Sequence, residues 1–174
     1  MNPEQATFLM HSMIGGFEFE SPTTRKVIAA IPDDKSSYQP DPKAKNAKQL
    51  AWHIVASEEW FLKSVIAGGF NMEGDGEEKL PAGVSTIDDI LAYYDKNVPP
   101  LVEQVRKLSG EKLAAPVDFF GVFKQPNVTY LGFLLNHSVH HRGQLSTYLR
   151  PMGSKVPSIY GGSADEPFQA SAQA

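Results

Sequence analysis

Residues 128–149 read VTYLGFLLNHSVHHRGQLSTYL, a long and mostly apolar stretch with histidines near its centre. Large side chains recur in it every three or four residues, which is the period of one face of an α-helix. This pattern predicts a helix that turns one face, histidines included, toward the interior of a helical protein. The residues on that face are Tyr130, Leu134, His137, His141, Leu145 and Tyr148.

His137 and His141 stand four residues apart. On a helix this spacing brings their Cβ atoms to about 5–6 Å from each other, so that both imidazoles can bind one metal ion at roughly 2.0–2.1 Å. The alternative is a pair of core histidines satisfied by hydrogen bonds. His140 lies on a more polar flank of the helix, and we do not expect it to be a ligand. A zinc protease is excluded, because Ser138 stands where that class has its catalytic glutamate.

The composition predicts a single globular domain over residues 1–168, followed by a frayed tail at residues 169–174. The net charge of −4 and the scattered basic residues argue against nucleic acid as a partner. Neither a membrane-spanning run nor a signal peptide is readable, so we expect a cytoplasmic protein. Because the chain has no cysteine, its metal ligands are restricted to imidazole, carboxylate and water.

Caps, prolines and apolar periodicity predict an all-α protein with four long helical segments. A four-helix bundle is the natural architecture for such segments. We expect Pro99 and Pro100 to kink or split the third segment, and residues 114–126 to be irregular or a short hairpin. The segments run from about Glu4 to Ile31, Asn46 to Ala67, Ser85 to Gly110 and Asn127 to Met152.

Three smaller features complete the expected organisation. Gly15-Gly16 marks either a break in the first helix near residues 18–21 or a close contact with another helix. Ser85 with Asp88 resembles a capping box at the start of the third helix. Residues 71–83 are acidic and rich in glycine, as in a surface loop.

The chain offers His53 as a third ligand for the histidine pair. Leu50 and Trp60 flank it at helical spacing and predict a buried position, and the small Ser57 leaves room one turn away. Three neutral imidazoles with positions left for water or substrate are typical of catalytic zinc sites. We interpret His11 as a structural or surface residue.

Three stretches of the chain resemble the DinB-like superfamily, and the resemblance extends from the first helix to Tyr160. Its most specific part is the histidine of the second stretch together with the His-x-x-x-His-Arg-Gly-Gln element of the third. The stretches are residues 24–32 (TRKVIAAIP), 47–60 (AKQLAWHIVASEEW) and 137–150 (HSVHHRGQLSTYLR).

The resemblance implies a four-helix bundle with up-down-down-up connectivity. It also implies a site in which His53, His137 and His141 hold a divalent metal ion, commonly zinc or nickel. Characterised relatives include S-transferases and isomerases that use low-molecular-weight thiols, whereas many relatives have no known activity. We therefore expect a metal-dependent enzyme, a homodimer, whose thiol substrate is a small molecule because the chain has no cysteine.

Two alternatives remain: a metal-dependent hydrolase, and a helical bundle that binds metal without catalysis. Glu58 and Glu59 follow His53 by five and six residues, which turns them off its face and leaves a hydrolase without an obvious base.

The roles of three neighbouring side chains are open. We expect Arg142 to point away from the site and hold the helix surface, and Gln144 either to line the cavity or to hydrogen-bond a ligand. Residues 156–165 are expected to fold back over the site, with Tyr160 either packing there or acting as a donor.

Overall fold

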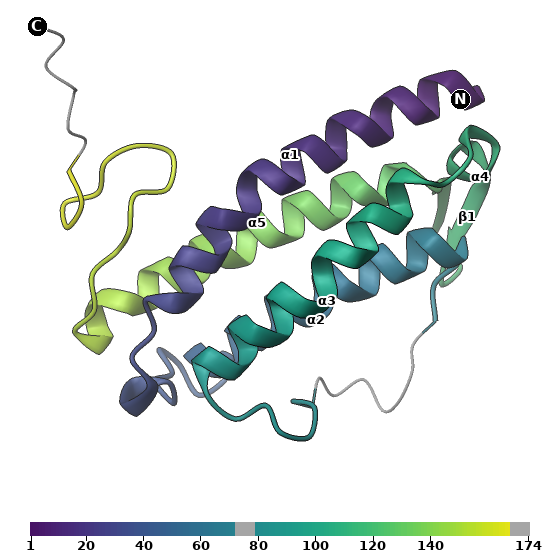
Figure 1. The fold of residues 1–174 in the computed structure, drawn as a ribbon. Helices are drawn as coiled ribbons and strands as arrows, with labels where there is room; N and C mark the ends of the chain where they lie inside the picture. Colours follow the sequence, from purple (N-terminus) through teal and green to yellow (C-terminus); the bar gives the residue numbers. More distant parts are fainter. Residues whose placement is uncertain (72–78, 168–174) are drawn as a thin grey trace, which may run out of the picture.

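The computed structural model describes residues 1–71 and 79–167. Four long helices pack side by side in it, and each contacts two of the others, in the ring order α1–α5–α2–α3. Figure 1 shows α2 and α3 running in one direction and α1 and α5 in the other. The predicted all-α bundle with up-down-down-up connectivity is therefore confirmed. The helices are α1 (Pro3–Ala29), α2 (Ala47–Ala67), α3 (Ile87–Arg106) and α5 (Thr129–Leu149).

Part of the predicted organisation lies outside the described residues. This holds for the predicted tail at residues 169–174 and for most of the predicted loop at residues 71–83. None of the helices in the described ranges combines the length and the apolar character that crossing a bilayer requires.

Three of the long helices begin at a capping box, a pair of residues in which each side chain accepts a hydrogen bond from the backbone N–H of the other residue. Asn2 caps α1 and Asn46 caps α2. Thr86 caps α3 together with Asp89, one residue later than the predicted Ser85 with Asp88. The Asp89 carboxylate accepts the backbone N–H groups of Thr86 and Ser85, and these bonds lower its pKa to about 2.

Between α3 and α5 the chain forms a short helix, α4 (Gly110–Ala114), and a hairpin of β1 (Pro116–Phe119) and β2 (Phe123–Pro126). The strands pair antiparallel with Phe119 opposite Phe123, which confirms the hairpin alternative for this insert. The sequence did not predict α4. Its first residue must be glycine, because a Cβ on Gly110 would lie 2.6 Å from the carbonyl oxygen of Pro3. Two 3-10 turns, η1 (Asp33–Lys35) and η2 (Arg150–Met152), complete the elements.

The helices α1 and α3 both run unbroken past residues that disfavour helix. Pro99 and Pro100 do not split α3. Their missing N–H groups leave the carbonyls of the exposed Asp95 and Lys96 without an intrahelical donor, and water can satisfy these carbonyls. In α1 no break occurs at the glycine pair. A Cβ on Gly16 would lie 3.4 Å from Leu135 Cδ2 of α5, so this glycine marks a close helix contact.

Arg142 lies in the core of the bundle, and the prediction that it holds the helix surface is wrong. Only 1% of its surface is exposed. Its guanidinium donates to the Glu20 carboxylate of α1 at 2.5 Å and to the Tyr160 hydroxyl at 2.7 Å. Arg142 falls on the same buried stripe of α5 as Leu134, Ser138 and Leu145. Its position on this stripe turns the side chain inward although arginine is a charged residue.

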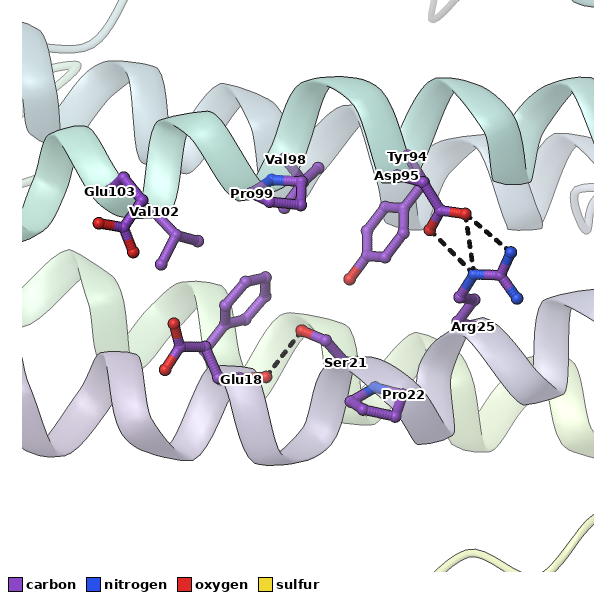
Figure 2. A pocket seen from close by; sticks show the side chains of 11 residues that line it. Glu18, Ser21, Pro22, Arg25, Tyr94, Asp95, Val98, Pro99, Val102 and Glu103 are labelled. Atoms are coloured by element: carbon purple, nitrogen blue, oxygen red, sulfur yellow. Dashed lines mark hydrogen bonds and ion pairs between the residues drawn. The ribbon is translucent and has the colours of Figure 1, made fainter.

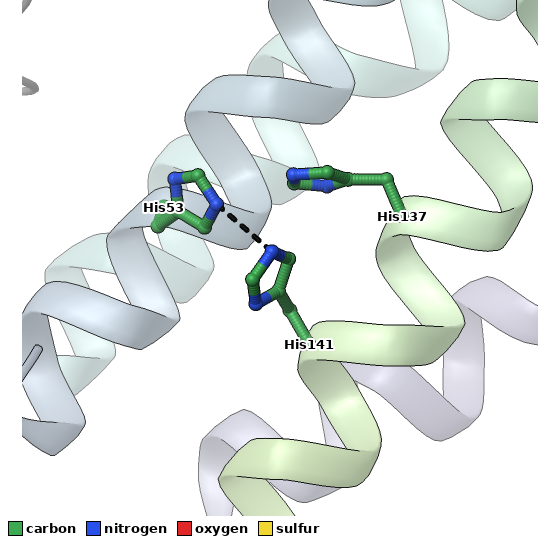
Figure 3. A group of neighbouring side chains, drawn as sticks. All are labelled: His53, His137 and His141. Atoms are coloured by element: carbon green, nitrogen blue, oxygen red, sulfur yellow. Dashed lines mark hydrogen bonds between the residues drawn. The ribbon is translucent and has the colours of Figure 1, made fainter. Parts of the chain in front are cut away.

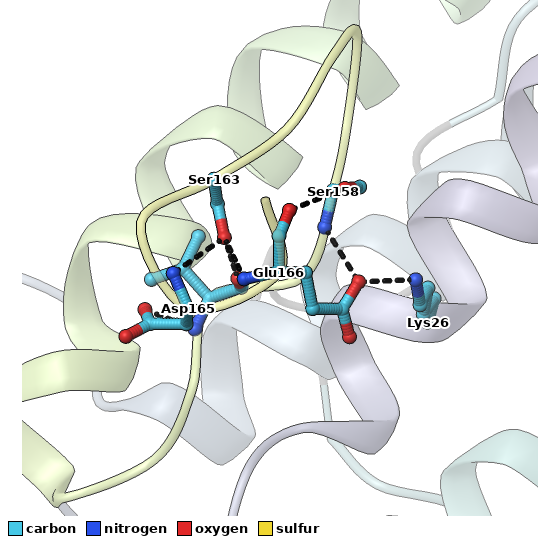
Figure 4. Close-up of polar contacts among 6 residues, drawn as sticks. Lys26, Ser158, Ser163, Asp165 and Glu166 are labelled. Atoms are coloured by element: carbon cyan, nitrogen blue, oxygen red, sulfur yellow. Dashed lines mark hydrogen bonds and ion pairs between the residues drawn. The ribbon is translucent and has the colours of Figure 1, made fainter. Parts of the chain in front are cut away.

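The C-terminal segment after η2 is tied to α1, as Figure 4 shows, and to Arg150 of η2. The Glu166 carboxylate accepts Lys26 Nζ at 2.7 Å and the Ser158 N–H at 2.9 Å. Asp165 accepts Arg150 Nε at 3.0 Å. These bonds bring Tyr160 onto Arg142, with the guanidinium carbon 5.1 Å from the ring centroid. Tyr160 therefore contacts Arg142, the residue that follows His141 in the sequence, and its hydroxyl accepts a hydrogen bond from the guanidinium.

Replacing Arg142 with methionine should destabilise the fold strongly, because the substitution leaves Glu20 without its partner at a nearly closed position. The expected loss is about 3 kcal/mol in free energy of unfolding. Arg25→Met, which breaks a pair with Asp95 whose side chains are 46% and 48% exposed, is the matched control and should cost less than about 1 kcal/mol. Urea unfolding followed by circular dichroism measures both. Equal losses in the two variants would contradict the structural role of Arg142.

Candidate metal centre

Three histidines from two helices face one another in the seam between α2 and α5. Figure 3 shows His53 of α2 opposite His137 and His141 of α5. One ring nitrogen from each lies within 4.8 Å of the others. The ring centroids are 4.4–4.9 Å apart. Within the described residues, this is the group of histidine and acidic side chains with the geometry to hold a metal ion.

The distance between two of these nitrogens suits a shared metal ion. His53 Nε2 and His141 Nε2 lie 3.2 Å apart. Two nitrogens at 2.0–2.1 Å from one ion, with a tetrahedral angle between them, are separated by about 3.3 Å. The pair therefore fits a zinc-sized ion without movement of either helix.

Gln144 fixes the orientation of one ring in this group. Its side-chain oxygen lies 2.9 Å from His141 Nδ1, and its amide nitrogen donates to the Tyr148 hydroxyl at 3.2 Å. An amide oxygen is an acceptor only, so His141 carries its proton on Nδ1 and turns the lone pair of Nε2 toward the other histidines. Of the two roles that the sequence left open for Gln144, the hydrogen bond to this histidine is the one observed.

His140 and His11 stand apart from the group. The ring of His140 packs edge-on against His141, with centroids 4.7 Å apart, but the residue is exposed on the flank predicted to be polar. His11 is exposed on α1.

An aromatic cluster borders the histidines, and no spacing in the sequence connects the two groups. It begins at Phe61, whose ring centroid lies 6.0 Å from that of His137. The hairpin contributes Phe120, which stacks parallel to Trp60 at 6.5 Å. Phe120 has a φ of 51°, a left-handed conformation that costs a non-glycine residue about 1–2 kcal/mol. The remaining members of the cluster are Phe70, Phe119, Phe123, Tyr130 and Phe133.

The two glutamates that follow His53 point elsewhere. Glu58 is 1% exposed and lies near the hydroxyls of Ser138 and Tyr94. Burial raises its pKa to about 7, although these hydroxyls and the charge of Arg142 act in the opposite direction. Glu59 accepts the Tyr93 hydroxyl at 2.8 Å and pairs with Lys63. These contacts agree with the expectation that neither carboxylate shares the face of His53.

The donor set is three imidazoles without a thiolate, which suits zinc or nickel better than calcium or magnesium. Each histidine is partly exposed. Small molecules in solution can therefore approach the group, with the aromatic cluster forming an apolar border on one side.

Known proteins are similar to this chain in sequence and in fold. The family model described as "DinB family" matches residues 5–170. The chain is 25% identical over 151 residues to the uncharacterized protein YrdA of Bacillus subtilis, covering 86% of this chain and 87% of YrdA. It is 26% identical over 139 residues to the uncharacterized YjoA of the same organism, covering 79% and 86%.

Two crystal structures are similar to this one. A DinB-like protein from Bacillus cereus ATCC 10987 superposes with a TM-score of 0.70 at 27% identity, covering 86% of this chain and 97% of that one. The DinB-like protein YjoA superposes with a TM-score of 0.67 at 22% identity, covering 85% and 97%, a likeness of fold. Because the family model spans nearly the whole chain, this protein belongs to the DinB family.

Proposed function

We propose that this protein is a metal-dependent enzyme in which His53, His137 and His141 hold one divalent ion, zinc or nickel. The observation that carries the proposal is the convergence of the three ring nitrogens within 4.8 Å. The hydrogen bond that His141 Nδ1 donates to Gln144 supports it, because a partner on the second ring nitrogen is the usual way to orient a metal-binding histidine.

Within that class, we propose transfer of a low-molecular-weight thiol, the activity that family resemblance favours. The bound ion would supply a Lewis acid that lowers the pKa of the thiol and stabilises its thiolate. The thiolate sulfur would then form a bond to an electrophilic carbon of the second substrate, whose leaving group departs with the electron pair. The chain contains no cysteine, so the sulfur must come from a small molecule.

The aromatic cluster gives the second substrate a place to bind. Phe61 adjoins His137, and Phe120 and Trp60 extend the apolar border outward. Such side chains bind an apolar group and keep water from the reacting sulfur. The proposed electrophile therefore carries an apolar or aromatic portion.

We further propose that the protein forms a homodimer and is located in the cytoplasm. Phe8 and Phe19 are each 77% exposed and, being eleven residues apart on α1, lie on one face of that helix. This face supports the proposal of a homodimer. We place the enzyme in the cytoplasm, where small thiols are kept reduced. Neither nucleic acid nor a membrane is a proposed partner.

Alanine at any of the three histidines should abolish tight metal binding. For His53→Ala, His137→Ala and His141→Ala we expect the affinity for Zn²⁺ or Ni²⁺ to fall more than ~100-fold, since even orienting partners contribute 10–100-fold. Isothermal titration calorimetry measures the affinity. In buffers of different ionisation enthalpy it also measures proton release, and the affinity should fall as the pH falls.

His140→Ala and His11→Ala are the matched controls and should bind metal as the wild type does. The three-histidine site is wrong if the wild type takes up neither metal, or if His140→Ala loses as much affinity as His141→Ala.

Removing the Gln144 side chain should weaken metal binding without unfolding the protein. Gln144→Ala is expected to lower the affinity about 10–100-fold, because His141 is no longer held in its Nδ1–H form. Gln144→Glu should retain the affinity, since a carboxylate accepts the same hydrogen bond. Calorimetry and circular dichroism test both variants, and wild-type affinity in Gln144→Ala would contradict this role.

The metal-loaded protein should consume a small thiol when an aromatic electrophile is present. The assay follows loss of free thiol over a panel of low-molecular-weight thiols, and metal-free protein and His137→Ala should be inactive. Phe120→Ala should raise KM more than it lowers kcat, because the ring binds the electrophile rather than the sulfur. Ester hydrolysis without thiol turnover would favour a hydrolase. Full metal loading without either reaction would favour a non-catalytic bundle.

A further inference from the structure

A cleft opens in the seam between α1 and α3, on the side of the bundle opposite to the three histidines. In the ring order of the helices, this seam and the α2/α5 seam do not share a helix. The cleft has a volume of about 340 Å³, within the range of small-molecule sites. Its floor consists of the buried apolar side chains of Phe17, Val98 and Val102.

Ion pairs bridge the seam at both ends of the cleft, and Figure 2 shows the one between Arg25 and Asp95. At one end, Arg25 donates to both carboxylate oxygens of Asp95 at 2.7–3.1 Å. At the other end, Arg106 pairs with Glu18. Between these pairs the helices do not close on each other, and Pro22 and Pro99 line the edges.

The Tyr94 hydroxyl lies at this cleft, close to the Ser21 hydroxyl and the Glu58 carboxyl. The residue is 4% exposed, and Figure 2 shows its side chain reaching from α3 toward α1 near Ser21. In the described part of the chain the Tyr94 hydroxyl has no hydrogen-bond partner of normal geometry, whereas Ser21 donates its own proton to the Phe17 carbonyl at 2.8 Å. A buried hydroxyl without a partner is costly, so a ligand group that supplies one gains affinity.

Tyr94 is a neutral phenol at neutral pH. Burial raises the pKa of the phenol well above its ordinary value of 10, and the nearby Glu58 carboxyl acts in the same direction. A neutral phenol can donate or accept a hydrogen bond, so the charge around the cleft decides which kind of ligand group it meets.

The charges around the cleft favour a cation. The carboxylates of Glu18, Asp95 and Glu103 outnumber the guanidinium groups of Arg25 and Arg106. Asp95 pairs with Arg25, and Glu18 and Glu103 share Arg106, so the rim carries one more negative than positive charge. The rim consequently attracts positive charge, and a tyrosine ring stabilises a cation over its face.

We propose that the α1/α3 cleft is a second binding site, separate from the histidine group, for a small organic amine with an apolar body. The apolar body lies on Phe17 and Val98. The ammonium group donates to the Tyr94 hydroxyl and faces the carboxylates of the rim.

Three probes with the same phenyl group and different charges test this site: phenethylamine, phenethyl alcohol and phenylpropionate. Titration of the protein, followed by amide chemical shifts in nuclear magnetic resonance spectra, should show phenethylamine shifting residues of α1 and α3 around the cleft, with a Kd on the order of 1 mM for so small a ligand. Phenethyl alcohol should bind more weakly and phenylpropionate should not bind.

Two variants test the contacts that define the ligand. Tyr94→Phe keeps the ring and should weaken phenethylamine about 3- to 10-fold, the usual contribution of one hydrogen bond. Glu103→Lys reverses a rim charge and should weaken it as well, whereas Asp34→Lys, the same charge change at an exposed residue outside the cleft, should not. His137→Ala should leave the binding unchanged, which separates this result from that of the metal centre.

The proposal is overturned if phenylpropionate binds as tightly as phenethylamine, or if the shifted residues lie outside the α1/α3 seam. It is equally overturned if phenethylamine binds Tyr94→Phe and Glu103→Lys as it binds the wild type, or does not bind the wild type.

Discussion

The guanidinium of Arg142 is closed off from water at the centre of the bundle, and a charge in that position is tolerable only where its partners surround it. Glu20 of α1 and Tyr160 of the C-terminal segment supply them. Because the planar guanidinium must meet both at once, the rotation of α5 about its own axis is fixed. The preceding residue, His141, is thereby directed to the adjacent face of the helix, about 100° away, toward α2.

The arrangement of the histidines follows from that constraint. One face of α5 carries the buried ion pair to α1, and the next face carries His137 and His141 against His53 of α2. The polar groups Glu58, Ser138 and Tyr94 lie between these features and the α1/α3 cleft. The bundle thus has polar groups in the α1/α5, α2/α5 and α1/α3 seams and apolar packing through most of its remaining interior.

The sequence alone predicted the helices, the connectivity and the three histidines, because each rests on a local period or on a family motif. It did not predict the burial of Arg142. The stripe Leu134–Ser138–Arg142–Leu145 carried that signal, but an arginine counts as a surface residue until a partner is known, and Glu20 lies 122 residues away in the sequence. The uninterrupted α3 depended on the exposure of Asp95 and Lys96. The approach of Phe120 to Trp60 depended on the path of the hairpin. The periodicity of the sequence predicts neither this path nor the exposure of the two residues in α3.

The central claim is that α2 and α5 together present one metal site made of three imidazoles. A crystal structure of the zinc- or nickel-loaded protein, with diffraction recorded at the absorption edge of the metal, tests it most directly. The account predicts one anomalous peak per chain, at roughly 2.0–2.1 Å from a ring nitrogen of each of His53, His137 and His141. A peak bound by surface carboxylates, or by the α5 pair with His53 turned away, would contradict it.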